Sequence, residues 1–186
     1  MVDQVNRIQK LPLAGALRIQ TLSFPDPRGS FNVVLTGPTL EQNGVHFDLK
    51  MEFRSVSKKG VLRGLHYQAG EHAQAKLVSC TWGEAYDVLV DLRKSSPTFG
   101  KWTGVHLRAQ DGQTLYIPRG FAHGYLALSQ EAELHYMADN MYEPSAERGV
   151  HYADPELKID WPIKTPPLLS KRDMIWPTWS KCEKFE

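Results

Sequence analysis

Short runs of alternating apolar and polar residues, separated by glycine and proline, dominate this sequence. The clearest covers residues 76–93, which read KLVSCTWGEAYDVLVDLR, and in it every second residue from Tyr86 to Leu92 is apolar or aromatic. A period of two places alternate side chains on opposite faces of a β-strand. The segment therefore predicts two strands joined by a turn at Gly83 and Glu84.

The same pattern recurs along the chain. Glycine, proline, serine and aspartate cluster between the runs and mark turns. Many short strands at a spacing of 8–12 residues are typical of a β-sandwich or barrel. Only residues 37–44 could hold a turn or two of helix, so strands do not alternate with helices and a Rossmann fold is disfavoured. Besides those of the first hairpin, the expected strands are residues 104–107, 114–117, 125–128 and 131–138.

The length of 186 residues predicts one all-β domain over residues 1–186. Its core is expected at roughly residues 24–162. Residues 163–186 are rich in proline and tryptophan and predict an irregular C-terminal arm. The arm is expected to pack on the barrel, because Trp176 and Trp179 are costly to leave exposed.

Composition excludes several classes of protein. With 22 Lys and Arg against 21 Asp and Glu, the formal charge is +1, which argues against a nucleic-acid-binding surface. No apolar run is long enough for a membrane span, and residues 1–10 contain no apolar signal core. The two cysteines, Cys80 and Cys182, are too few for a disulfide scaffold. They predict reduced thiols in a cytoplasmic protein.

A histidine in the segment GVLRGLHYQ, residues 60–68, is the first candidate for chemistry. With a reference pKa near 6.5, His66 could act as a general base, although a hydrogen-bonded structural histidine is the simpler interpretation. On a regular strand Gln68 shares its face with His66 and Arg63 points to the other face. Gly64 could break this alternation, so Arg63 could still reach the same cavity.

A second group of candidates follows further along the chain. His123 comes after a sharp turn in IPRGFAHGY, residues 117–125, and Lys76 begins a strand. Beside Arg63, Lys76 could hold a phosphate or stabilise an oxyanion. Tyr136 offers a phenol with a reference pKa of about 10 as a proton donor. Each has an ordinary structural interpretation, as does the loop acid Asp173.

A metal site is only weakly indicated. Two histidines from separate strands could be ligands, but a metal needs three or four. Position 68 is Gln68, so no H-x-H pair follows His66. The residues alone therefore predict an all-β barrel whose cavity could hold two histidines, an arginine, a lysine and a tyrosine.

At these residues the sequence closely resembles the dTDP-4-dehydrorhamnose 3,5-epimerase family of nucleotide-sugar epimerases. The ordered motifs span roughly residues 24–173 and are far more specific than any single histidine. They are F-x-D-x-R-G-x-F at 24–31, the segments 60–68, 74–102 and 117–125, AELHY at 132–136, the turn at 142–144, DPELKIDWP at 154–162 and LLSKRD at 168–173.

The resemblance implies a cupin-type jelly roll that works as a homodimer and uses no metal or other cofactor. The substrate class it implies is an NDP-4-keto-6-deoxyhexose, with no nucleic-acid or membrane partner. In this family the C4 ketone acidifies the hydrogens at C3 and C5. A base removes one of them, and an acid returns a proton to the opposite face.

Individual residues match the family's functional positions. His66 matches the base, Asp173 the acid that pairs with it, and Tyr136 the proton donor on the other face. Lys76 matches the lysine near the enolate oxygen, and Arg63 a diphosphate contact. The remaining matches are to substrate binding. His123 lies near the sugar or phosphate, and Gln68 and Arg119 stand in the matching segments 60–68 and 117–125. Arg28 and Phe31 lie in a segment that reaches the substrate, expected across the dimer.

The sequence departs from the family pattern at positions associated with nucleotide binding. Val33 stands where the family has Glu, and Met141 where it has Tyr. The family's Q-x-N has become Met51-Glu52-Phe53. These changes predict a more apolar nucleotide pocket and an altered specificity for the base or the sugar. Two alternatives stay open: an epimerase that acts only at C3 or C5 on another nucleotide such as CDP, and a non-catalytic cupin that binds a sugar nucleotide.

Overall fold

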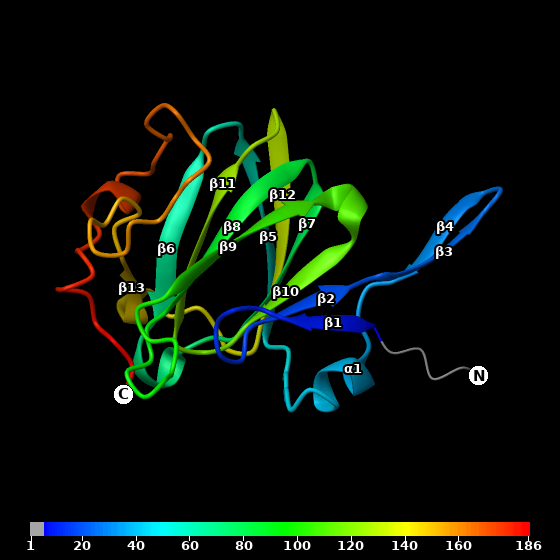
Figure 1. The fold of residues 1–186 in the computed structure, drawn as a ribbon, viewed down its shortest axis with the longest axis horizontal. Coiled ribbons are helices and arrows are strands. Elements are labelled where there is room, and N and C mark those ends of the chain that lie inside the picture. Colours follow the sequence, from blue (N-terminus) through cyan, green and yellow to red (C-terminus); the bar gives the residue numbers. More distant parts are fainter. Residues whose placement is uncertain (1–5) are drawn as a thin grey trace.

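The computed structural model describes residues 6–186 and forms a sandwich of two antiparallel sheets (Figure 1). The large sheet has the strand order β1-β2-β10-β7-β12-β5, and the small sheet β13-β6-β11-β8-β9. The all-β prediction is thus confirmed, and the sheets agree with a cupin-like fold.

In the large sheet β1 is Arg7–Lys10, β2 Leu17–Gln20, β5 Met51–Lys58, β7 Lys76–Trp82, β10 Gln113–Ile117 and β12 Glu131–Ala138. In the small sheet β6 is Leu62–Gln68, β8 Glu84–Asp91, β9 Trp102–Arg108, β11 Phe121–Ala127 and β13 Glu147–Gly149.

The predicted strands are found close to their expected positions. Residues 76–93 form β7 and β8, and Gly83 between them has a φ of +73° that suits glycine. Strand β11 begins at Phe121, four residues before the expected start, because the fully buried stretch from 121 has no alternation to reveal it. The segment 37–44 holds only the short helix α1, Gly37–Glu41.

The main core lies between the two sheets. Val78, Leu115 and Leu134 of the large sheet pack with Leu89 and Leu107 of the small sheet, all buried. Burying apolar side chains of this kind is the main driving force for folding.

Two further layers cover the outer faces. The C-terminal segment packs Trp161, Trp179 and Phe185 against the outside of the small sheet, as its tryptophans predicted. Helix α1 and its flanking residues cover part of the large sheet through Leu40 and Val45. The remaining elements are the 3₁₀ turns η1 Gly70–His72, η2 Ala109–Asp111, η3 Pro144–Ala146 and η4 Asp173–Ile175.

A separate hairpin extends away from the sandwich (Figure 1). It consists of β3, Leu22–Asp26, and β4, Gly29–Val33. Most of its residues are exposed, including the aromatic rings of Phe24 and Phe31. Burial therefore does not explain its extended position within one chain.

Candidate active site

A cavity of about 240 Å³ opens into the sandwich and brings together three of the four predicted catalytic residues and three of the predicted substrate contacts. Its walls come from both sheets, because β6 and β11 belong to the small sheet and β5, β7 and β12 to the large one. The lining residues are Phe53, Ser55, Arg63, His66, Lys76, His123, Gly124, Tyr125 and Tyr136. A larger hollow of about 490 Å³ lies under the β3–β4 hairpin, but none of the predicted catalytic residues lines it.

Strand β6 delivers both Arg63 and His66 to this cavity. Gly64 has a φ of +131°, and a Cβ there would lie 2.5 Å from the Cα of Gly124 on β11. The β6–β11 pairing shifts register between His123 and Tyr125. This break in the strand agrees with the role expected of Gly64.

His66 forms a dyad with Asp173. His66 Nε2 lies 2.5 Å from Asp173 Oδ1, and the Ser170 hydroxyl donates to Asp173 Oδ2 at 2.7 Å. Burial raises the pKa of Asp173, but hydrogen bonds from His66 and Ser170 outweigh that effect and hold the pKa at about 2. The carboxylate is therefore ionised at neutral pH. It fixes Nε2 as the protonated nitrogen of a neutral imidazole and leaves Nδ1 as the basic one.

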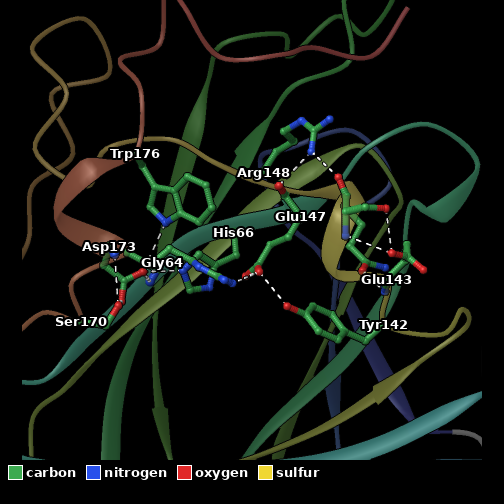
Figure 2. A network of polar contacts seen from close by, with 12 residues as sticks. Gly64, His66, Tyr142, Glu143, Glu147, Arg148, Ser170, Asp173 and Trp176 are labelled. Carbon is green, nitrogen blue, oxygen red and sulfur yellow. Dashed lines mark hydrogen bonds and ion pairs between the residues drawn. The ribbon is translucent and has the colours of Figure 1, made fainter.

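Trp176 supports this dyad and was missed as a site residue. Its Nε1 donates to Asp173 Oδ1 at 3.3 Å, and its ring meets His66 edge-on with centroids 5.7 Å apart (Figure 2). A Cβ at Gly149 would lie 2.3 Å from the indole, so glycine makes room for the ring. The spacing of three residues from Asp173 to Trp176 across η4 is the only signal in the sequence.

A second pair, His123 and Asp87, lies deeper in the cavity wall. His123 Nε2 is 2.8 Å from Asp87 Oδ2, and both side chains are buried. Asp87 Oδ1 has no hydrogen-bond partner among residues 6–186. Sequence reasoning missed Asp87, which reads as one polar residue in the alternation of β8.

Lys76 supplies a cation beside these groups. Burial lowers its pKa from 10.5 to about 8, and the charges of Asp87 and Glu147 limit that fall. An ammonium in a partly dry cavity interacts more strongly with a nearby oxyanion than it would in water.

Tyr136 reaches the cavity from β12 and is held between aromatic neighbours. Its ring lies parallel to that of Phe53, with centroids 4.7 Å apart and an interplanar angle of 3°, and meets His123 edge-on at 6.0 Å. Burial raises the pKa of Tyr136 well above 10. The phenol is therefore protonated at neutral pH and can donate a proton.

The guanidinium of Arg63 is anchored to β5. Its Nε donates to Ser57 Oγ at 2.9 Å, and Nη2 donates to the carbonyl of Val56 at 3.2 Å. Ser55 and Ser57 also contact the hydroxyl of Tyr125, each at 2.8 Å.

Several predicted residues lie outside the cavity. The Gln68 amide donates to the carbonyls of His72 and Met141 and accepts from Glu143 N, so it holds a turn. Arg119 pairs with Asp139 at 2.9 Å. Arg28 and Phe31 are exposed on the hairpin. Val33 ends β4, Met51 begins β5, and Met141 is exposed on its turn.

A polar network beside the dyad was also missed by sequence reasoning. Glu147 accepts a hydrogen bond from the Tyr142 hydroxyl at 2.7 Å (Figure 2). It also forms an ion pair with Arg172. Because Arg172 precedes Asp173, these contacts hold the dyad's segment of the C-terminal arm against β13. Residues 6–186 contain no group of three or more His, Cys, Asp or Glu side chains placed to hold a metal ion.

The cavity has His66, paired with an ionised Asp173, on one wall and a protonated tyrosine on the other sheet, which is the arrangement of a cupin-like epimerase that works by proton transfer. The family model described as dTDP-4-dehydrorhamnose 3,5-epimerase matches residues 10–181. The chain belongs to this family.

Known relatives cover nearly the whole chain. The dTDP-4-dehydrorhamnose 3,5-epimerase of Shigella flexneri is 45% identical over 89% of this chain and 91% of its own. The dTDP-4-dehydrorhamnose 3-epimerase of Streptomyces niveus is 38% identical over 95% and 91%. The crystal structure of dTDP-6-deoxy-D-glucose-3,5-epimerase from Legionella pneumophila, in complex with dTDP-4-keto-L-rhamnose, has a TM-score of 0.90 and 38% identity. It covers 95% of this chain and 94% of its own.

Proposed function

We propose that this protein epimerises C3, C5 or both carbons of an NDP-4-keto-6-deoxyhexose in deoxysugar biosynthesis. The observation that carries the proposal is the cavity between the two sheets. His66 of the small sheet lines one wall and is paired with Asp173 of the C-terminal arm, and the protonated Tyr136 lines the opposite wall on the large sheet. A base and an acid on opposite walls are what inversion of a carbon requires.

The reaction follows from these positions. His66 Nδ1 takes the proton from the carbon next to the C4 ketone, and Asp173 stabilises the imidazolium that forms. Lys76 stabilises the negative charge on the enolate oxygen. Tyr136 then gives its proton to the opposite face of the same carbon, and exchange with solvent restores both groups.

The diphosphate and the base of the nucleotide need separate contacts. Arg63 lines the cavity with a fixed guanidinium, which suits a phosphate oxygen. His123 at the wall contributes to sugar or phosphate binding. Val33, Met51 and Met141 carry no groups for polar base recognition, so we propose that the nucleotide pocket is more apolar than in the dTDP-rhamnose enzymes and that specificity for the base or the sugar is altered.

We propose a homodimer as the working unit. Arg28 and the exposed ring of Phe31 lie on a hairpin that extends from its own sandwich, in a position to reach a second copy. Burial of such an apolar ring against a partner is favourable. We place Arg28 beside the partner's substrate diphosphate.

The dimer predicts a specific molar mass. Sedimentation is expected to give twice the 21.1 kDa of one chain. Phe31→Asp is expected to shift the mass toward that of one chain, because a charge replaces the ring that the proposed dimer buries. Phe47→Leu, on the outer face of the large sheet, is expected to leave the mass unchanged. A 21.1 kDa species for the unaltered protein would contradict the dimer.

We propose a cytoplasmic location. Cys80 and Cys182 are both buried free thiols, as expected in a reducing compartment. No helix within residues 6–186 has the length and apolar character to cross a membrane.

The lysine in the cavity predicts an alkaline limit on activity. Because burial lowers the pKa of Lys76 to about 8, its charge is present below that pH and is lost above it. We expect kcat/KM to fall as pH rises through about 8. Lys76→Arg keeps the positive charge at all pH values used and should move the fall in kcat/KM to higher pH. A fall at an unchanged pH would show that another group causes it.

The proposed activity is tested by incubation in D₂O with dTDP- and CDP-linked 4-keto-6-deoxyhexoses. Deuterium is expected at C3 and C5, with inverted product. Incorporation at one carbon only would support a single-site epimerase, the activity that the name of the Streptomyces niveus relative gives. No incorporation would leave a non-catalytic sugar-nucleotide-binding cupin. A clear dTDP preference at normal rate would refute the altered nucleotide pocket.

A further inference from the structure

The ring that packs against Tyr136 is a feature of the catalytic cavity itself. Phe53 and Tyr136 are direct partners across the β5–β12 pair, and Phe53 lines the cavity with His66 and Lys76. The structure thus brings Phe53 to the acid that completes the reaction. By resemblance, the family has an amide at this position, so the aromatic ring distinguishes this chain.

Two aromatic contacts restrict the phenol. The Phe53 ring is parallel to that of Tyr136 with centroids 4.7 Å apart, and His123 meets the same ring edge-on. Rotation of Tyr136 about its side-chain torsions would break the parallel contact, whose geometry is favourable beyond simple burial. Phe53 therefore resists a change in the direction of the hydroxyl.

That direction matters because the enolate has two possible outcomes. His66 can return a proton to the face from which it took one, which exchanges the hydrogen without inversion. Alternatively, the O–H bond of Tyr136 breaks, a C–H bond forms on the opposite face, and the carbon is inverted. The two outcomes share the enolate and differ only in which group delivers the proton.

We propose that Phe53 is a positioning residue that aligns Tyr136 and thereby favours inversion over exchange without inversion. This role rests on the proposed epimerase function. It concerns the fate of the enolate and leaves the removal of the first proton to His66 and Asp173.

The test measures both outcomes in D₂O at early times with the dTDP-linked 4-keto-6-deoxyhexose. If the protein prefers the CDP-linked sugar, the same measurement uses that sugar. Deuterium in recovered, uninverted substrate reports exchange, and inverted product reports donation by Tyr136. Phe53→Leu removes the flat contact and is expected to raise the ratio of exchange to inversion about three- to tenfold. Phe53→Tyr keeps a ring in place and should stay within about twofold of the original ratio.

A matched control separates positioning from general damage. Phe47→Leu makes the same change at a partly buried ring on the outside of the large sheet, where Phe47 contacts Tyr116. It is expected to leave the ratio unchanged. If Phe53→Leu does not fold, Phe53→Met provides a flexible apolar side chain for the same measurement.

The outcomes are distinguishable from failure of the proposed function. An unchanged ratio in Phe53→Leu or Phe53→Met, with both rates lowered together, would overturn the positioning role and leave Phe53 as a packing residue. No deuterium incorporation by the unaltered protein would instead overturn the epimerase function.

Discussion

Replacing His66 with alanine is expected to abolish deuterium incorporation at C3 and C5 together with all inversion. A general base contributes about 10²–10⁴-fold to a rate. Here His66 lines the cavity and pairs with a carboxylate that is ionised, because hydrogen bonds keep the pKa of Asp173 at about 2. Removing the imidazole takes away the N–H donor of Asp173 and leaves the substrate without a base.

The other histidine of the cavity is not placed to compensate. His123 Nε2 is 2.8 Å from Asp87, and the side chain is only 5% exposed. If His66→Ala retained exchange at the original rate, another base would have to be identified. His135→Ala serves as the control, because His135 also lies on a strand but pairs with Glu52 at 2.8 Å away from the cavity; it is expected to retain full activity.

The alternation of apolar and polar residues revealed those strands that have one buried face and one more polar face. The segment 76–93 is such a case and forms β7 and β8. The hairpin β3–β4 gave no such signal, because nearly all of its residues are exposed and neither face is selected for burial. Strands β1 and β2 are only four residues long, too short for a period to be distinguished from chance.

The sequence identified candidate residues for the site but not the distances between them. His66 and Asp173 are 107 residues apart in the chain, and only the fold brings His66 Nε2 to 2.5 Å from Asp173 Oδ1. The family resemblance paired them, whereas composition and spacing did not. The sequence did not reveal the roles of Trp176 and Asp87. The packing of an indole and a buried ion pair depend on which segments lie side by side in the tertiary structure.

The altered positions of the family pattern also have a different meaning in three dimensions. Sequence reasoning grouped Phe53 with Met51 and Met141 as nucleotide contacts. In the structure Phe53 stacks on Tyr136, while Met141 is exposed on a turn whose backbone Gln68 holds. Residues that share one departure from the family pattern therefore lie in different surroundings in the structure.

Replacing Tyr136 with phenylalanine is expected to stop inversion while exchange without inversion continues. The substitution removes only the hydroxyl, so the ring can still stack on Phe53 and the fold should be retained. Because burial raises the pKa of Tyr136 well above 10, the phenol is protonated at neutral pH and can complete inversion from the large sheet. Loss of a general acid predicts a fall in inversion of about a hundredfold or more.

Exchange should survive because it needs only His66, Asp173 and the charge of Lys76, which the substitution leaves in place. Early-time deuterium incorporation in D₂O measures exchange, and the yield of inverted sugar measures donation from the opposite face. Tyr116→Phe is the control, since that hydroxyl lies on β10 outside the cavity. An equal fall of both rates in Tyr136→Phe would show that the phenol also stabilises the enolate. Unchanged inversion would require a different acid, and the parallel stack with Phe53 would then be packing alone.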